Sequence, residues 1–242
     1  MKTILITGAS RGIGADIARF FAKNGYNVVV NYYKSETQAQ NLASELGTYG
    51  VRAVAIKADV GNPAEVKNLI KQALAVFGKI DVLVNNAGVS LNKLLIDSTT
   101  QDIEDVMLTN LLGTIYVTKE MLPSMLSNNY GKIINIASMW GNYGGSMESV
   151  YSASKGGVIA FTKAIAKEVG LSGINVNCVC PGVIVTDMLN NLTIEDMQNL
   201  KNQTAIGRVG YPRDISALVY FLASDDASYI TGSVINADGG IV

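Results

Sequence analysis

Short apolar segments rich in valine and isoleucine alternate along the chain with longer segments in which apolar residues recur at helical spacing. The short segments predict strands at residues 3–7, 27–31, 52–57, 82–85, 132–137, 175–179 and 233–236. The longer segments predict helices at residues 13–24, 36–49, 64–77, 101–127, 150–169 and 214–223. Apolar strands separated by helices are typical of βαβ units, in which a parallel sheet is buried on both faces.

This order of elements predicts an α/β fold. We expect a single doubly wound Rossmann domain over residues 1–242, with a mostly parallel seven-stranded sheet and helices on both faces. A chain of 242 residues that is 48% hydrophobic can bury one large core. The polar segment 189–206, after the sixth strand, is expected to be a helical insertion or a mobile lid.

Composition narrows the classes of function. The 19 basic and 20 acidic side chains give no global attraction to nucleic acid or to an anionic membrane. No segment reads as a signal peptide or a membrane span, so we expect a cytoplasmic protein. The absence of histidine removes the commonest metal ligand and general base, and we expect no metal. The two cysteines, Cys178 and Cys180, are expected to be buried free thiols.

A glycine-rich turn joins the first strand to the first helix. Glycine lets the backbone approach a pyrophosphate closely, and the helix N-terminus offers free N–H groups and a partial positive charge. The spacing differs from the usual G-x-G-x-x-G, and a tight structural turn is the alternative reading, but the position favours dinucleotide binding. The residues expected to contact the cofactor here are Gly8, Ser10, Arg11, Gly12, Ile13 and Gly14.

The end of the second strand bears on which dinucleotide binds. A site for NAD normally carries Asp or Glu there to hold the ribose 2′-hydroxyl, whereas this strand ends in Asn31 and Tyr32. No carboxylate there repels a 2′-phosphate, and Arg11 and Lys34 could pair with one. The sequence therefore favours NADPH; the alternative is that Arg11 is only a solvated loop charge.

Two further loops follow strands at the edge where ligands bind in open α/β sheets. Asp59 and Val60 come after the third strand, and Asn86, Ala87 and Gly88 come after the fourth. Ordinary loop polarity could explain either loop alone. Because both lie at carboxyl ends of strands, we expect these five residues to contact the cofactor.

Four polar residues are candidates for the chemistry. Tyr151 and Lys155 are four residues apart, so a helix places the phenol and the ammonium on one face. Ser138 directly follows the fifth strand, and its hydroxyl can converge with them beside the glycine turn. A positive neighbour is expected to lower the pKa of Tyr151, as general acid–base catalysis requires. Asn110 is polar within the apolar face of a long helix, and a satisfied core amide is the alternative reading there.

The motifs TGASRGIG, NNAG and YSASK, with the turn at Pro181 and Gly182, resemble the short-chain dehydrogenase/reductase family over essentially the whole chain. The resemblance implies that Ser138 orients a carbonyl, Tyr151 donates the proton, Lys155 holds the ribose and Asn110 anchors a water relay. It also implies a homotetramer. The segment expected beside the nicotinamide comprises Pro181, Gly182, Ile184 and Thr186.

Within the family, the segments TGASRGIG and LASDDASYITG resemble the 3-oxoacyl-acyl-carrier-protein reductases, which implies NADPH-dependent reduction of a 3-oxoacyl thioester. There is a departure, because those reductases typically carry basic residues for the acidic carrier where this chain has Asn128-Asn129 and Leu171-Ser172. Reduction of acetoacetyl-CoA is therefore an alternative.

The segment SMWGNYGGSMESVYSASKGG, with Trp140 and Glu148, also resembles a paralogous branch of firmicute bacteria. That resemblance implies reduction of the 5-aminopentanone group on elongation factor P. Trp140 could equally be a wall of the substrate cleft, and Glu148 a solvated loop acid. A dinucleotide-sensing protein without turnover is the alternative outside enzymes, although the intact Ser138, Tyr151 and Lys155 argue against it.

Overall fold

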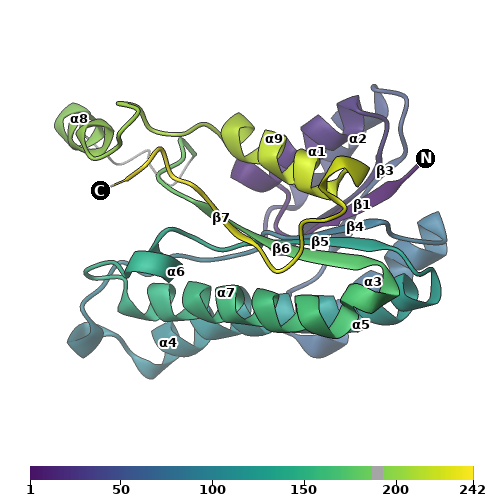
Figure 1. Ribbon diagram of the computed structural model, residues 1–242, viewed down its shortest axis with the longest axis horizontal. Coiled ribbons are helices and arrows are strands. Elements are labelled where there is room, and N and C mark those ends of the chain that lie inside the picture. The colour runs from purple at the N-terminus through teal and green to yellow at the C-terminus, as the bar shows by residue number, and fades with distance from the viewer. Residues whose placement is uncertain (187–192, 242) are drawn as a thin grey trace.

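Seven parallel strands form one sheet in the computed structural model, which describes residues 1–186 and 193–241 (Figure 1). The strands are β1 (Thr3–Ile6), β2 (Asn27–Tyr32), β3 (Ala53–Lys57), β4 (Val82–Asn85), β5 (Gly131–Ile136), β6 (Ile174–Pro181) and β7 (Val234–Ala237). In their order, β3-β2-β1-β4-β5-β6-β7, the strands up to β3 are added on one side of β1 and the strands from β4 onward on its other side. The predicted doubly wound α/β fold is confirmed, with every strand end within two residues of its predicted position.

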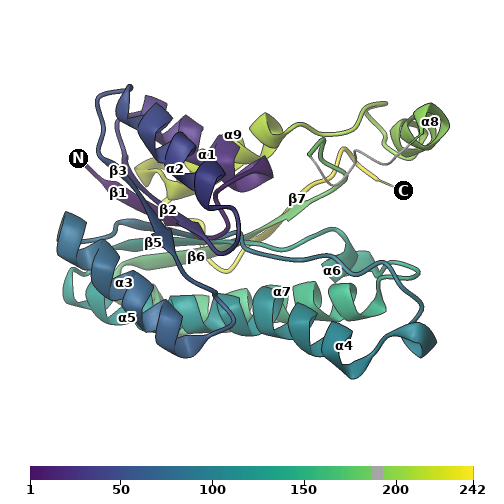
Figure 2. The same ribbon diagram turned by 180° about the vertical axis from the view of Figure 1, so that it is seen from behind.

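Two layers of helices cover the sheet (Figure 2). One layer contains α1 (Gly12–Lys23), α2 (Glu36–Gly47) and α9 (Pro212–Ala223), and the other contains α3 (Pro63–Phe77), α4 (Thr100–Met107), α5 (Gly113–Ser127) and α7 (Ser149–Val169). Alternate residues of each strand serve the two layers. In β1, Ile4 and Ile6 pack with α1 and α9, whereas Leu5 packs with α3 and α5. The sheet is therefore buried on both faces, as its apolar strands predict.

One predicted helix is interrupted. Residues 101–127 were expected to form a single helix, but α4 and α5 are separated by η2 (Leu108–Leu112), a π-helical turn. Such turns are rare and often occur at functional sites. Asn110 lies in this turn, where the side chain bonds to Val89 fix its position.

Several short helices were not predicted, namely α6 (Trp140–Tyr143) and the 3₁₀ turns η1 (Leu95–Asp97), η3 (Gly170–Ser172) and η5 (Asp225–Ala227). The expected insertion after the sixth strand contains α8 (Ile194–Asn202), which confirms a helix there. The part of that insertion at 189–192 lies outside the described residues.

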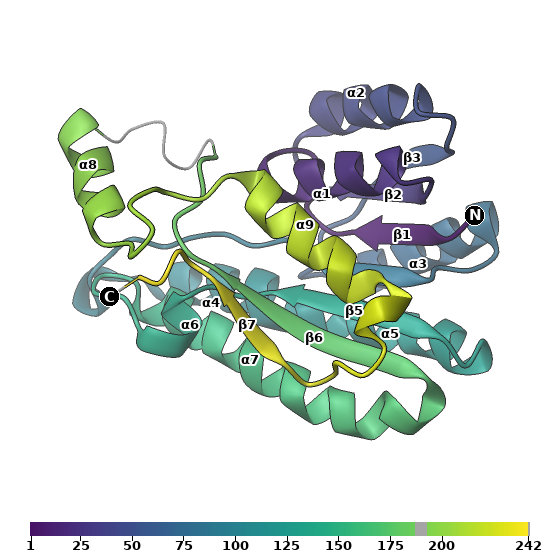
Figure 3. The same ribbon diagram turned by 45° about the horizontal axis from the view of Figure 1, so that its top comes forward.

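The carboxyl ends of the strands define the functional edge of the molecule. The short helix α6, the start of α7 and helix α8 all lie at this end, close to the C-terminus (Figure 3). Residues 204–206 pair with the chain end, because Thr204 bridges Ile241 and the Ala205 amide donates to the Gly240 carbonyl at 3.2 Å. In residues 1–186 and 193–241 no helix combines the length and hydropathy needed to cross a membrane.

Candidate active site

The glycine turn packs too closely against its neighbours to accept side chains. Gly8 has a φ of +61°, and a Cβ there would lie 2.8 Å from the Ala87 Cα. A Cβ on Gly14 would lie 2.6 Å from Asn86 Nδ2 and 2.7 Å from the Gly8 carbonyl oxygen. The turn is therefore packed tightly against the loop after β4 and leads directly into the N-terminus of α1. We call this glycine turn the cradle, because a glycine turn at a helix N-terminus is the kind of backbone that can bind a pyrophosphate.

Asn86 and Thr7 fix the shape of that turn. Asn86 Nδ2 donates to the carbonyl oxygens of Thr7 and Gly8, both at 3.0 Å. The Thr7 hydroxyl accepts the backbone N–H groups of Asn86 and Ala87, also at 3.0 Å. The loop after β4 thus braces the loop after β1. Thr7 was missed as a site residue, although its hydroxyl at a strand end was visible in the sequence.

Asn31 lies beneath the turn and does not face solvent. Only 1% of this residue is exposed, and its Oδ1 accepts the Gly8 N–H at 3.2 Å. Its Nδ2 donates to the carbonyl oxygens of Ile56 and Ala58 at 3.3 and 3.1 Å. Tyr32 is also buried. The Asn31 side chain therefore couples β2, β3 and the glycine turn.

Two cations stand at the surface of the same region. Arg11 is exposed at the N-cap of α1. Exposed Lys34 follows β2, with its Nζ 5.5 Å from the centroid of the Tyr33 ring. Both can move toward an anion at this edge. Ser10 and Ile13 complete the turn, and Ile13 packs against the core beside α1.

Asp59 and Val60 end the loop after β3. Asp59 Oδ1 accepts the Gly61 N–H at 2.9 Å, while Glu65 accepts the Asp59 N–H at 2.9 Å. Val60 is buried against α5, where a Cβ on Gly113 would lie 2.8 Å from its Cγ2. Asp59 remains at the edge of the site, and Val60 anchors the loop that carries it.

Tyr151 and Lys155 lie on α7, and Lys155 is only 4% exposed. The Lys155 ammonium donates to the Ile136 carbonyl oxygen at 2.9 Å and lies 5.8 Å from the centroid of the Tyr151 ring. Gly88, in the loop after β4, lies next to Lys155 and Asn110, because a Cβ on Gly88 would lie 3.3 Å from both Lys155 Nζ and Asn110 Oδ1. The fold therefore brings the predicted residues of three separate elements together.

Asn110 is fully buried and its amide is fully used. Its Oδ1 accepts the Val89 N–H at 2.8 Å, and its Nδ2 donates to the Val89 carbonyl oxygen at 2.9 Å and to Ser154 Oγ at 3.0 Å. This amide joins the β4 loop to α7 directly beside Lys155. Ser154 was not identified from the sequence, because its value depends on a contact with residue 110.

Ser138 faces the phenol from the turn after β5. Its hydroxyl accepts the Trp140 N–H at 3.2 Å, which fixes the start of α6. The hydrogen bond between Ser138 and the phenol favours ionisation of Tyr151, but burial outweighs it and raises the Tyr151 pKa, and the Glu148 charge adds to the rise. The expected lowering of this pKa is thus absent in the free protein, where the ammonium of Lys155 is directed at the Ile136 carbonyl.

Burial also controls Lys155 itself. Removal from water lowers the pKa of its ammonium to about 8. The Cys178 and Cys180 thiols are buried and free, with their sulfur atoms 4.0 Å apart, which confirms the prediction for both. At neutral pH the site therefore holds a protonated phenol and a buried ammonium.

The segment between Ser138 and Tyr151 forms one wall of the site. A Cβ on Gly145 would lie 3.1 Å from the Trp140 ring and 3.3 Å from the Glu148 Cβ, so the indole packs over this loop beside Glu148. Glu148 is the N-cap residue of α7. Burial raises the pKa of its carboxyl, and a hydrogen bond from Asn92 partly opposes that rise. No ion pair to Glu148 occurs among the described residues.

The chain after β6 returns to the glycine turn. Gly182 packs on β7, where its N–H donates to the Ala237 carbonyl oxygen at 3.0 Å and a Cβ would lie 2.6 Å from the Asp238 Cα. Ile184 is buried and pairs with Gly210. Thr186 Cγ2 lies 3.5 Å from the position of a Cβ on Gly12. The segment that starts at Pro181 thus lies next to the cradle.

In the described part of the chain no three His, Cys, Asp or Glu side chains are grouped as metal ligands. The site therefore consists of a glycine cradle with a hydroxyl, a phenol and an ammonium beside it. A phenol with an ammonium beside it can move a proton at a reacting oxygen.

Comparison with known proteins identifies this arrangement. A family model described as Enoyl-(Acyl carrier protein) reductase matches residues 8–242. The chain belongs to this family of short-chain dehydrogenases/reductases, oxidoreductases that interconvert ketones and alcohols with a nicotinamide dinucleotide. It is 44% identical to the 3-oxoacyl-[acyl-carrier-protein] reductase FabG of Staphylococcus epidermidis, over 99% of this chain and 98% of that protein.

Two other relatives cover the chain equally well. The 3-oxoacyl-[acyl-carrier-protein] reductase of a Synechocystis species is 44% identical over 100% of this chain and 97% of its own length. The FabG protein of Haemophilus influenzae is 40% identical over 99% of this chain and 98% of its own length. The similarity therefore extends over the whole fold, including the loops that build the site.

Proposed function

We propose that this protein is an NADPH-dependent reductase that converts a 3-oxoacyl thioester, carried by an acyl carrier protein, to the 3-hydroxyacyl thioester. The observation that carries the proposal is the convergence of Ser138, Tyr151 and Lys155 beside the glycine cradle. Relatives that are 44% identical over nearly their whole length have the name of this reaction.

The residues at the edge fit a dinucleotide with a 2′-phosphate. At positions 8 and 14 the cradle accepts only glycine, because a Cβ would overlap the loop after β4 or the turn itself. A tight glycine turn at a helix N-terminus is typical of pyrophosphate sites in dinucleotide-binding folds. Arg11 and Lys34 are exposed near the end of β2, which carries no carboxylate. The residues proposed to hold NADPH are Gly8, Ser10, Arg11, Gly12, Ile13, Gly14, Asn31, Tyr32, Asp59, Val60, Asn86, Ala87, Gly88, Tyr151, Lys155, Pro181, Gly182, Ile184 and Thr186.

The protein's own groups would act on the substrate as follows. When bound, the nicotinamide supplies the hydride for the carbonyl carbon. Ser138 donates a hydrogen bond to the carbonyl oxygen and orients it, and Tyr151 donates its proton to that oxygen as the alcohol forms. Lys155 binds the ribose and stabilises the phenolate that remains. Asn110, which is fixed by hydrogen bonds to Val89 and Ser154, would anchor the water relay.

The same proposal includes one domain over residues 1–242, a cytoplasmic location and a homotetramer. An exposed apolar surface at η1 supports subunit contact, since Leu95 and Ile96 are 59% and 90% exposed. Beside them a cavity of roughly 340 Å³ is lined by Ile103, Met107 and Val150. A measurement of molecular mass in solution tests the tetramer.

A second candidate substrate is a ketone that carries an amine, such as the 5-aminopentanone group on elongation factor P. The observation that favours it is Glu148, a half-buried carboxylate close enough to Tyr151 to raise the phenol pKa and without an ion pair in the described chain. A substrate ammonium would supply the missing partner. Glu148→Gln should then weaken an aminoketone about tenfold more than a neutral ketone, because one charged hydrogen bond is lost.

Steady-state kinetics with NADPH decide between these substrates. We expect kcat/KM to be highest for a 3-oxoacyl group on the carrier protein or on coenzyme A, and lower for an aminoketone. A clear preference for the aminoketone would favour the second candidate. No turnover of any ketone, with thermal stabilisation by NADPH alone, would favour the dinucleotide-sensing alternative.

A further inference from the structure

Four buried polar side chains form a continuous set of hydrogen bonds below the site. Asn85 and Asn135 are direct neighbours on β4 and β5, and Asn85 Nδ2 donates to Asn135 Oδ1 at 2.8 Å. Asn85 Nδ2 also donates to Thr118 Oγ1 on α5 at 3.0 Å, and Asn135 Nδ2 donates to Thr162 Oγ1 on α7 at 2.9 Å. We call these four residues the amide ladder.

The amide ladder stands in an apolar interior. Asn135, Thr118 and Thr162 are fully buried and Asn85 is 3% exposed. The core on this face of the sheet, to which α5 and α7 contribute, is made of aliphatic and methionine side chains with Tyr116 and Phe161 packed against them. The Thr162 hydroxyl donates to the Val158 carbonyl oxygen at 2.8 Å, so it is oriented to accept from Asn135.

Stability does not by itself explain these side chains. A buried polar group is unfavourable unless it is paired, and replacing both partners by apolar groups of similar shape is often neutral or stabilising. The amide ladder also carries an unpaired group, because the buried Asn85 Oδ1 has no hydrogen-bond partner among the described residues. Apolar surfaces can slide against each other, whereas a hydrogen bond fixes both a distance and a direction.

Each member of the amide ladder lies on the same element as a residue of the site, or on the element directly adjoining it along the chain. Thr162 lies seven residues beyond Lys155 on α7, which is two helical turns or roughly 10 Å. Thr118 follows Asn110 along η2 and α5. Asn135 precedes Ser138 by three residues, and Asn85 immediately precedes Asn86. The ladder therefore joins all four site-bearing elements one layer below the site.

We propose that the amide ladder is a positioning device, which sets the axial position and rotation of α7 and α5 on the sheet so that Tyr151 and Lys155 face Ser138. A shift of one residue along a helix moves a side chain by about 1.5 Å, and a misplacement of about 1 Å can reduce a rate about 10²-fold. The inference rests on the proposed function, because the positioned groups are those assigned to the reaction.

Thr162 offers a matched pair of variants. Thr162→Val has nearly the same shape but cannot accept from Asn135, whereas Thr162→Ser keeps the hydroxyl and loses a methyl group. We expect kcat to fall about tenfold in Thr162→Val and to stay within about twofold in Thr162→Ser. Ile165→Val, which removes a buried methylene on the same helix, controls for lost stability and should leave kcat unchanged.

A readout without turnover separates this inference from the proposed function. The ionisation of Tyr151 can be followed by its phenolate absorbance, as the difference between each protein and its Tyr151→Phe version. We expect the midpoint to move in Thr162→Val and not in Thr162→Ser or Ile165→Val, whether or not any ketone is reduced. If Thr162→Val does not fold, Thr118→Val and Thr118→Ser serve as the pair. An unchanged midpoint and kcat in the valine variant, or equal changes in both variants, would overturn the proposal.

Discussion

Lys155 shows how the burial of one side chain sets the behaviour of the site. Its pKa falls to about 8 because the ammonium is removed from water, so the charge is lost as the pH rises through about 8. Between about pH 8 and the ordinary pKa of 10.5, the unfolded chain keeps the Lys155 proton and the folded chain does not. The buried charge therefore lowers the free energy of unfolding below about pH 8, and this loss of stability disappears as the pH rises toward 10.5. At neutral pH this buried charge therefore does not stabilise the folded chain.

The first prediction follows from that charge. We expect kcat/KM for ketone reduction to fall as the pH rises above about 8, since this parameter reports groups of the free enzyme. Tyr151 does not set this limb, because burial raises its pKa and keeps it protonated there. Lys155→Arg retains a permanent charge and should be slower but lack the fall. A fall that persists in Lys155→Arg would assign it to another group.

Arg11 is the residue that we propose to favour NADPH over NADH. Arg11→Ala should weaken NADPH more than NADH, because only NADPH has the 2′-phosphate, and a charge-assisted hydrogen bond contributes roughly 1.5–3 kcal/mol. The ratio of the two kcat/KM values should therefore fall by about one to two orders of magnitude. Exposed Arg52, which donates to the Val76 carbonyl oxygen away from the cradle, provides the control variant Arg52→Ala. Equal losses for both cofactors would remove Arg11 from this role.

At the scale of elements, helix α1 tests the cradle. Gly14→Ala should lower NADPH affinity and destabilise the fold by about 1–3 kcal/mol, because its Cβ would overlap Asn86 and the Gly8 backbone. Gly47→Ala in α2 is the matched change, since nothing lies within 4 Å of that position. It should leave NADPH binding unchanged, as measured by titration of cofactor fluorescence. Normal NADPH affinity in Gly14→Ala would contradict the cradle.

The elements also show what the sequence predicts and what it does not. All seven strands were predicted because buried parallel strands are continuous apolar runs. The π turn at η2 was not, because it depends on the pairing of Asn110 with Val89, which is distant in sequence. In the same way, Tyr151 and Lys155 were found by their spacing, but the raised Tyr151 pKa was not, because it depends on burial in the folded chain.

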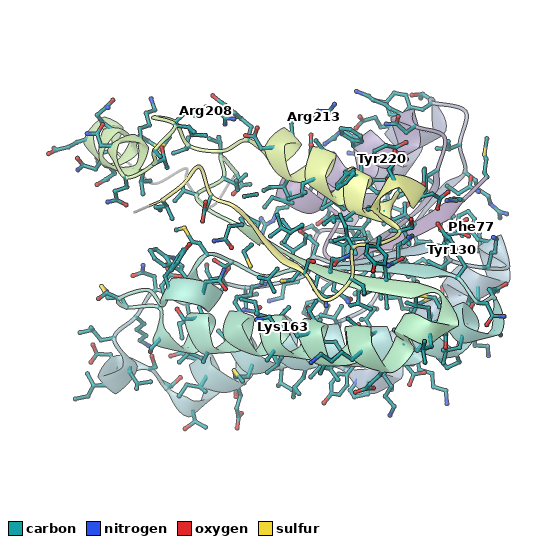
Figure 4. The ribbon with its side chains drawn as sticks, viewed as in Figure 1. Phe77, Tyr130, Lys163, Arg208, Arg213 and Tyr220 are labelled. Atoms are coloured by element: carbon teal, nitrogen blue, oxygen red, sulfur yellow. The ribbon has the colours of Figure 1, made fainter. Side chains whose placement is uncertain are left out.

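At the scale of the whole molecule, the site is far from the surface at which the 3-oxoacyl-acyl-carrier-protein reductases typically carry basic residues for the carrier and this chain does not. Asn129 and Gly173 are in contact, since a Cβ on Gly173 would lie 2.5 Å from the Asn129 carbonyl oxygen. These residues lie at the amino ends of β5 and β6, so the length of the sheet separates them from the site. Figure 4 shows Tyr130, next to Asn129, at the opposite end of the molecule from Arg208.

A charge-insertion experiment tests this surface. Asn129 has a φ of +47°, which strains arginine, so Asn128 is the better position. Asn128→Arg with Ser172→Arg should raise kcat/KM several-fold for the carrier-bound ketone at low salt, with the gain lost as salt rises. The coenzyme A substrate should not change, and Gln40→Arg on exposed α2 is the control. A strong, salt-dependent preference for the carrier in the unmodified protein would show that another basic surface docks it.

The most direct test of the central claim combines turnover and binding in Tyr151→Phe. This change removes the phenolic proton and keeps the ring, so NADPH should still bind while kcat for a 3-oxoacyl thioester falls about 10²–10⁴-fold. The two quantities are measured on the same protein, by cofactor fluorescence and by the rate of NADPH oxidation. A turnover close to that of the unmodified protein, with NADPH bound normally, would contradict the assignment of Tyr151 as the proton donor.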